Sequence, residues 1–419
     1  MKRSTKTIRL AAVAAAGTLV LAACGGGDDG GGGDDAGAVA KGDGTLVVGT
    51  LLPSTGDLAF LGPPEFAGVD LAVKDINEAG GVLGKDVTQS KADSGDGTPK
   101  IAPGSVDKLL GANADTIIGA ASSSVSLSVI DKIINAGVVH FSPANTSTAF
   151  DTYDDKGMYF RTAPSDVLQG NVLGNLVLQK GAKSVAILAR QEAYGEALAD
   201  NTEKTIKDQG GTVAAKVLYS VDATSYTSEV QKIKDAKPDA IVLISFNEAT
   251  KIIPEFESAG IGPQDVQTYF VDGNTADYSK DFPKGTLEGI LATYPGAELK
   301  DDFKQRMLEV DPKLKDFTYG PESYDATVMS ALAAEAAKND SGEAIASELI
   351  NVSRDGEACT TFADCVKLVK AGEDIDYNGV SGPIDLNKTG SPSKATIGIF
   401  EYNNDNKYDN TDYITGVVE

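Results

Sequence analysis

The sequence predicts an α/β protein with parallel β-sheets that carry helices on both faces. From Thr45 onward, short apolar runs rich in β-branched residues alternate with longer amphipathic stretches. This alternation is typical of the strands and crossover helices of a parallel sheet. The chain has 419 residues, of which 41% are hydrophobic and 23% are charged, so a globular protein of two or three domains, or of one large body with two lobes, is expected.

The first predicted strand covers residues 46–52, because this run is continuously apolar and rich in valine and leucine. A helix is predicted after it, since Pro64 favours a helix start and Gly80 and Gly81 favour a helix end. Further strands are predicted at residues 116–119, 138–142, 184–189, 211–219, 240–245, 268–271 and 289–293. The helices between them are predicted at residues 101–110, 125–136, 167–180, 195–208, 226–235 and 249–259.

The pattern changes after Tyr294. Helices dominate from this point, at residues 299–309, 324–339 and 345–350, and short strands are predicted from there to the end of the chain.

The amino terminus has the pattern of an export signal. Four basic residues precede an apolar run at residues 10–23, which at fourteen residues is too short to cross a bilayer as an ordinary helix. The run ends in Leu-Ala-Ala-Cys at residues 21–24, which resembles the lipobox of bacterial lipoproteins. That resemblance implies a signal peptide at 1–23 and lipidation of Cys24, followed by a Gly/Asp-rich flexible tether at 24–44. The alternative is an ordinary secretory signal with an unrelated cysteine.

Charge and composition exclude several functions. The net charge is −24, and −28 without the basic signal, so nucleic acid is not an expected partner. The single histidine, His140, excludes a multi-histidine metal site and lies in an apolar run, where a packed strand residue is more common than a catalytic base. Ser381 lies in a GVSGP segment that lacks the second glycine of a nucleophile elbow, and the chain has no P-loop. The sequence therefore predicts no enzyme, no cofactor and no metal.

Cys359 and Cys365 are the two remaining cysteines, and they lie six residues apart. Outside the cytoplasm such a pair is expected to form a disulfide that closes a small loop. Two free buried thiols are the alternative.

Four loops at predicted strand ends carry polar side chains. They cover residues 53–62, 120–124, 142–147 and 270–274. Taken singly, such residues are usually helix caps and turns. Because ligands of parallel sheets bind beyond the carboxyl ends of the strands, the four loops together predict a pocket. The hydroxyl-rich loops favour a carboxylate and Asp272 favours an ammonium, so the expected ligand is a zwitterion.

Several segments resemble the periplasmic solute-binding proteins of the leucine/isoleucine/valine-binding type, the receptors of ABC importers. The strongest are INEAGGVLG at residues 76–84 and FRTAPSD at residues 160–166, and the resemblance extends from Thr45 to about Tyr408. It implies a type I periplasmic-binding-protein fold, with two doubly wound parallel-sheet lobes joined by a three-strand hinge. The implied lobes are residues 45–164 with 294–397, and residues 165–293 with 398–419.

The resemblance also implies a set of ligand-binding residues. Ser123, Ala144 and Thr146 would hold the ligand carboxylate, and Asp272 would hold the ammonium. The positions that would surround the rest of the ligand are Tyr194, Phe246 and Leu61. Three positions depart from the family pattern: Leu61 stands where a tyrosine is common, Phe246 replaces a hydroxyl-bearing tyrosine, and Asp272 is one methylene shorter than the usual glutamate.

The function implied is that of an extracytoplasmic, lipid-anchored substrate-binding protein of an ABC importer. As a monomer, it would capture an amino acid, either branched-chain or a related small zwitterion or amide. Hinge closure would enclose this ligand for delivery to the membrane permease. The alternatives are a sensor that signals to a membrane partner and a receptor for another solute, such as an amide or an aromatic acid.

Overall fold

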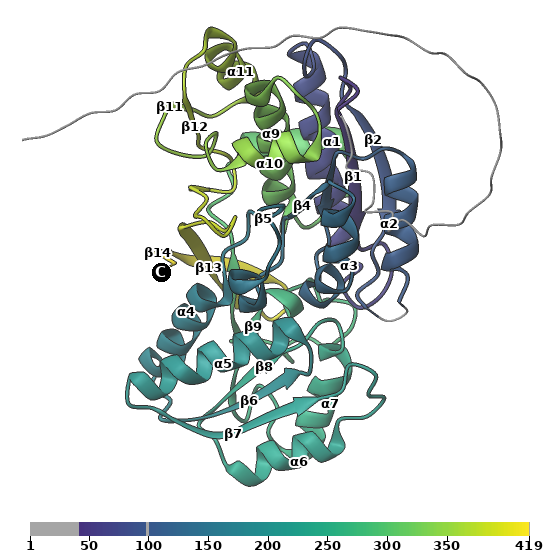
Figure 1. Cartoon of the computed structure of the whole chain (residues 1–419). Helices are drawn as coiled ribbons and strands as arrows, with labels where there is room; N and C mark the ends of the chain where they lie inside the picture. The colour runs from purple at the N-terminus through teal and green to yellow at the C-terminus, as the bar shows by residue number, and fades with distance from the viewer. Residues whose placement is uncertain (1–41, 98–99, 419) are drawn as a thin grey trace, which may run out of the picture. The chain divides into compact units, whose positions relative to one another are not determined.

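The computed structural model describes residues 42–97 and 100–418, and most of its helices and strands are labelled in Figure 1. The predicted signal peptide, the predicted lipidation site Cys24 and most of the predicted tether lie outside the described residues. Among the helices of the described part, none is both long and apolar enough to span a bilayer.

The first sheet has the strand order β2-β1-β3-β4-β5, and every neighbouring pair is parallel. Its strands are β1 (Val47–Leu52), β2 (Thr88–Asp93), β3 (Thr116–Gly119), β4 (Val139–Ser142) and β5 (Tyr159–Arg161). Helices α1 (Gly62–Glu78) and α9 (Gly320–Ala337) share one core with this sheet, whereas α2 (Ala102–Gly111) and α3 (Ser123–Asn135) share the other. The first sheet, these helices, α8 (Asp301–Val310), α10 (Gly342–Leu349) and α11 (Phe362–Ala371) are called the first lobe below.

The second sheet has the order β14-β13-β10-β9-β8-β6-β7. Its strands are β6 (Ser184–Arg190), β7 (Thr212–Tyr219), β8 (Ala240–Ile244), β9 (Gln267–Val271), β10 (Leu291–Pro295), β13 (Lys394–Tyr402) and β14 (Tyr408–Val417). All neighbouring pairs are parallel except those that involve β13, which runs antiparallel to β10 and to β14.

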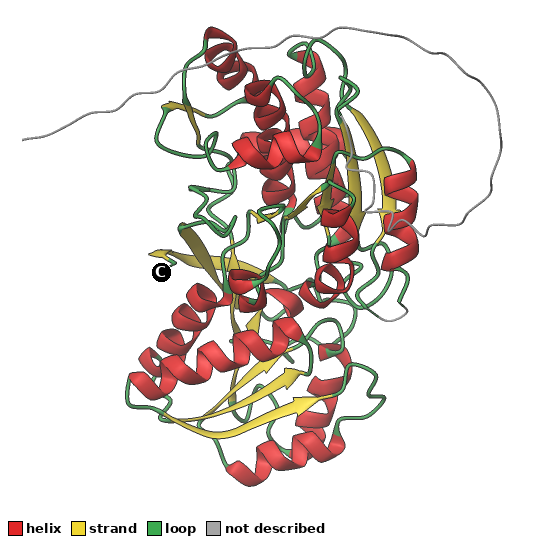
Figure 2. Cartoon of the chain, viewed as in Figure 1, coloured by secondary structure: helices red, strands yellow, loops and turns green. Residues whose placement is uncertain are grey.

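Helices cover both faces of the second sheet (Figure 2). Val185 and Ile187 of β6 pack with α4 (Asp166–Gln179) and α5 (Ala193–Asp208), and Ala186 and Leu188 pack with α6 (Thr227–Ala236) and α7 (Ala249–Ala259). This alternation is what a strand buried on both faces requires, because successive side chains point to opposite sides. The second sheet and these four helices are called the second lobe.

The observed architecture confirms the predicted α/β fold class. Two strands of the first sheet were not predicted. Strand β2 reads TQSKAD and is polar because it lies at the edge of the sheet, and β5 has only three residues.

The chain passes between the two halves of the molecule three times, twice from the half that contains the first sheet and the small sheet of β11 (Glu357–Cys359) and β12 (Ile375–Tyr377), and once back to it. The passages follow β5, β10 and β12. Strand β12 pairs with β11 in this small separate sheet, beside which Cys359 and Cys365 are joined by a disulfide with a Cα–Cα distance of 5.4 Å.

Helices α1 and α9 approach closely at Gly68. A Cβ atom at this position would lie 2.1 Å from the carbonyl oxygen of Gly320. We expect Gly68→Ala to lower the free energy of unfolding by about 1–3 kcal/mol, because the helices would have to separate. Gly104→Ala on α2 is the matched control, since a Cβ atom there would have no neighbour within 4 Å and alanine favours the helix. Urea titrations followed by circular dichroism would measure the free energy of unfolding of both variants. Equal changes in the two variants would show that the contact between the helices at Gly68 has no particular importance for stability.

Candidate functional site

A small cavity lies between the two lobes, beyond the carboxyl ends of their strands. Its volume is about 20 Å³. The residues that line it come from both lobes: Leu58, Leu61, Ala121, Ser122, Ser123, Ala144, Tyr194, Phe246, Asp272, Gly273 and Tyr319. This space is enough for about one water molecule. Any larger ligand therefore requires the two lobes to move apart.

Six of the seven predicted ligand-binding residues line this cavity. The seventh, Thr146, is only 1% exposed and lies in the same loop as Ala144. Its carbonyl oxygen accepts the backbone N–H of Asp166 at 2.7 Å, whereas its hydroxyl has no hydrogen-bond partner among the described residues. Burial and the charge of Asp272 raise the pKa of Asp166 well above its usual range. The structure thus brings the predicted residues together from six separate segments of the chain, including the start of α5 at Tyr194 and the loop after β8 at Phe246.

The first-lobe side of the cavity is the amino-terminal end of α3. The Ser123 hydroxyl accepts a hydrogen bond from the backbone N–H of Ser147 at 3.3 Å, so its own proton remains available for a ligand. The Ser122 hydroxyl has no hydrogen-bond partner among the described residues. These hydroxyls and the positive end of the helix dipole together favour an anionic group.

The second-lobe side of the cavity is dominated by Asp272, which is 4% exposed. Oδ1 accepts hydrogen bonds from the Tyr194 hydroxyl at 2.5 Å and from Gln169 Nε2 at 3.0 Å, and Oδ2 accepts one from the Tyr319 hydroxyl at 2.8 Å. Burial raises the pKa of Asp272, and these hydrogen bonds oppose the rise. A carboxylate offers about four acceptor positions, so one position on Oδ2 stays open to a ligand ammonium.

Two aromatic rings form another side of the cavity. Tyr194 and Phe246 are stacked with their centroids 5.7 Å apart. The guanidinium of Arg190, at the end of strand β6, lies 3.3 Å from the Phe246 centroid and pairs with Glu248 at 2.7 Å. The cation therefore holds the ring in place by a cation–π contact.

Arg161 fixes the loop that contains Thr146. Its side chain is fully buried, donates to the carbonyl oxygens of Ser147 at 2.9 Å and Asn145 at 3.4 Å, and pairs with Asp151. Because those two carbonyls flank Thr146, the guanidinium sets the position of the Thr146 side chain. Sequence reasoning did not identify this role, although Arg161 lies in the FRTAPSD segment.

Tyr319 was also missed. It begins α9 with a left-handed backbone (φ 58°) and contacts Asp272 from the opposite lobe. No predicted strand ends near Tyr319, so the signal that located the other loops was absent.

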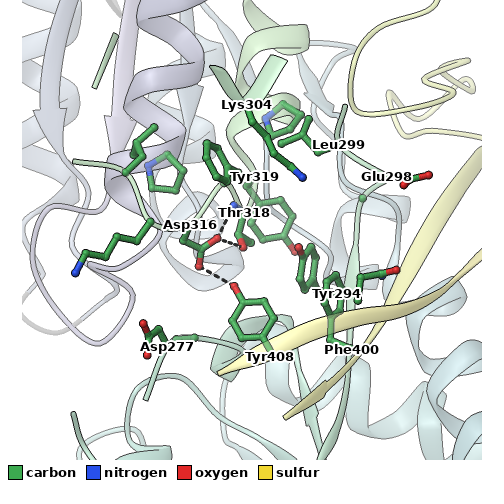
Figure 3. Close-up of a pocket in the computed structure, with 18 of the residues that line it drawn as sticks. Asp277, Tyr294, Glu298, Leu299, Lys304, Asp316, Thr318, Tyr319, Phe400 and Tyr408 are labelled. Atoms are coloured by element: carbon green, nitrogen blue, oxygen red, sulfur yellow. Dashed lines mark hydrogen bonds between the residues drawn. The ribbon is translucent and has the colours of Figure 1, made fainter. Parts of the chain in front are cut away.

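A larger groove of about 1290 Å³ adjoins the cavity, and Tyr319 lines both (Figure 3). Figure 3 shows that Tyr408 and Thr318 donate hydrogen bonds to the Asp316 carboxylate. The Tyr408 hydroxyl is 3.0 Å from Oδ2, and the Thr318 hydroxyl is 2.6 Å from Oδ1. Lysines and carboxylates both line the groove, so its charge does not select one class of ligand.

His140 lies away from the cavity in the core of the first lobe. It is fully buried, its ring meets that of Tyr159 edge-on at 5.3 Å, and burial lowers its pKa to about 3. The residue is therefore neutral at physiological pH, as expected of a packed strand residue.

Two α/β lobes that meet over a small cavity lined by apolar and polar side chains are typical of hinged ligand receptors. The family model described as "Periplasmic binding protein" matches residues 45–406. The chain therefore belongs to the periplasmic binding protein family, and membership implies an extracytoplasmic location.

Individual relatives agree with this assignment. The chain is 26% identical over 358 residues to the chemotactic signal transduction system substrate-binding protein BasB of Halobacterium salinarum, covering 81% of this chain and 83% of the relative. It is 27% identical over 278 residues to a leucine-, isoleucine-, valine-, threonine- and alanine-binding protein of Pseudomonas aeruginosa, covering 65% and 69%. The crystal structure of LivJ from Streptococcus pneumoniae in complex with isoleucine superposes with a TM-score of 0.72 at 22% identity, covering 89% of this chain and 100% of LivJ, and shows the same fold.

Proposed function

We propose that this protein captures an amino acid, branched-chain or a related small zwitterion, and delivers it to the permease of an ABC importer. The observation that carries the proposal is that the two sides of the cavity favour ligand groups of opposite charge. The amino-terminal end of α3 and the hydroxyl of Ser123 favour a carboxylate, and buried Asp272 on the facing lobe favours an ammonium. The amino-acid-binding relative from Pseudomonas supports this ligand class.

The capture mechanism follows from the division of the site between the lobes. A ligand first meets the first lobe through Ser123, Ala144 and Thr146, and the second lobe then brings Asp272, Phe246 and Tyr194 against it. Each lobe supplies only part of the contacts, so the ligand binds the closed state more tightly than the open state and shifts the protein toward it. In this proposal the lobes are residues 45–164 with 294–397 and residues 165–293 with 398–419, except that residues 294–295 and 394–397 lie in strands β10 and β13 of the second lobe. A lipid on Cys24 holds the protein at the membrane, and no chemical step occurs.

A second candidate function is a sensor that signals to a membrane partner, which the chemotactic relative from Halobacterium favours. Uptake of labelled ligand by cells with and without this protein separates the two functions. An importer receptor is expected to raise the rate of uptake, and a sensor is expected to leave it unchanged.

The proposed site is tested by calorimetry with a panel of amino acids, small amides and aromatic acids. For the ligand that binds, Thr146→Val is expected to raise Kd about 10- to 100-fold, because it removes a hydroxyl that would bond a charged group. Thr202→Val is the control, since this hydroxyl is likewise buried without a hydrogen-bond partner among the described residues but lies in the middle of α5, outside the loops that line the cavity. An unchanged Kd for Thr146→Val would show that the ligand binds elsewhere.

A further inference from the structure

Glu192 caps the helix that carries Tyr194. Its Oε1 accepts the backbone N–H of Gly195 at 2.9 Å, and its Oε2 accepts that of Tyr194 at 3.0 Å. Caps of this kind fix the first turn of a helix. The direction of the Tyr194 ring toward Asp272 therefore depends on the Glu192 carboxylate.

The same carboxylate lies beside the second aromatic ring of the site. Glu192 Oε1 is 3.2 Å from Arg190 Nε, and the side chains of Arg190 and Glu192 are only 6% and 10% exposed. The Arg190 guanidinium in turn covers the ring of Phe246. Glu192 therefore contacts the first turn of the helix that carries Tyr194 and also the arginine that covers Phe246.

Contacts with the first lobe converge on this position. The Ser124 hydroxyl donates to Glu192 Oε2 and accepts the backbone N–H of Ala193 at 3.2 Å. The Ser147 hydroxyl donates to the carbonyl oxygen of Ala193 at 2.8 Å. Ser124 and Ser147 each follow directly after a proposed ligand residue, Ser123 and Thr146.

We infer that Glu192 is a positioning residue of the ligand site and that its bond with Ser124 couples the approach of the first lobe to the placement of Tyr194 and Phe246. The part of the inference that concerns ligand affinity rests on the proposed function. The part that concerns lobe approach does not, because these contacts form directly between the lobes. When the lobes separate, the hydrogen bond from Ser124 to Glu192 is lost, and the Glu192 carboxylate keeps only its partners in the second lobe.

The first experiment needs no ligand. Cysteines are introduced at two exposed positions, Ala112 in the first lobe and Lys232 in the second, and each carries a spin label. Double electron–electron resonance then measures the distance between the lobes. In the ligand-free protein, Ser124→Ala and Glu192→Gln are each expected to shift the distribution toward longer distances, and the double variant is expected to shift it no further than the larger single change. Ser128→Ala is the control, because this α3 hydroxyl bonds Val125 within its own helix at 2.7 Å. Distributions identical to the wild type, or single effects that simply add, would overturn the inference.

The second experiment measures affinity with L-leucine as the probe. Each single variant is expected to raise Kd about 5- to 20-fold, and the double variant is expected to show the same rise rather than the product, because both remove one shared bond. If Glu192 acted only as a helix cap, Glu192→Gln would raise Kd by the same factor in the wild-type protein and in the Ser124→Ala variant. If wild-type protein does not bind L-leucine or any member of the calorimetric panel, the proposed function fails, and the distance measurement still decides the inference.

Discussion

Asp272→Asn is expected to raise the Kd of a zwitterionic ligand about 100- to 1000-fold. The carboxylate is the buried anion that faces the proposed ammonium, and removing one member of a buried charge pair costs about 2–5 kcal/mol. Asparagine keeps the size of the side chain and can keep the oxygen that accepts from Tyr194 and Gln169, while its amide nitrogen can donate to the Tyr319 hydroxyl oxygen. The effect therefore reports mainly the loss of charge. Calorimetry with the ligand identified by the panel would measure it.

The control for this variant is Asp277→Asn. Asp277 lies shortly after η2 (Asp272–Asn274), lies outside the lining of the small cavity and is 42% exposed beside Lys407. Its replacement is expected to leave Kd unchanged. Equal affinities for the wild type and Asp272→Asn would show that the ligand carries no cation at this position.

Arg161→Met is expected to lower the free energy of unfolding by about 2–4 kcal/mol. The change leaves the carbonyl oxygens of Asn145 and Ser147 without their buried donor and leaves Asp151 without its cation. Asp151 is 30% exposed, and this exposure reduces the cost relative to a fully buried pair. The loop that contains Thr146 also loses its support, so the ligand should bind more weakly even where the variant is folded.

Arg306→Met is the matched control for the Arg161 variant. Arg306 pairs with Asp75 but its side chain is 40% exposed, so its loss should cost about 1 kcal/mol or less. Urea titrations of both variants would give the two values. A similar small loss for both would show that the buried network around Arg161 contributes little stability.

The parts of the fold that could be predicted from sequence are those with a local signal. Strands β1, β3 and β8 are buried on both faces, so their apolar runs mark them clearly. Strand β2 carries no such run, because its position at the sheet edge leaves it partly exposed. Its pairing with β1 is a tertiary property that composition does not reveal.

The same distinction holds for the site. The rule that ligands bind beyond strand ends predicted the loops that contain Ser123, Ala144 and Asp272, and the family resemblance singled out Ser123 and Ala144 within their loops. Tyr319 begins a helix far along the chain, and Arg161 and Glu192 act through partners that only the folded chain brings together. The cavity volume also depends on how the lobes meet, which no sequence pattern describes.

The three passages between the two halves of the molecule have a consequence for the order in which the protein can fold during synthesis. The five strands from β6 to β10 are adjacent in the second sheet and come from one uninterrupted stretch, residues 184–295. The strands of the first sheet are made earlier, but one face of this sheet is covered by α9 as well as α1, so its burial is incomplete until the ribosome has passed residue 337. The central part of the second sheet can therefore form from residues 184–295 before the first lobe is complete, although β13 and β14 join it only when the end of the chain has been made. This departs from the usual amino-terminal-first order and leaves part of one face of the apolar strands β1, β3 and β4 uncovered on the nascent chain.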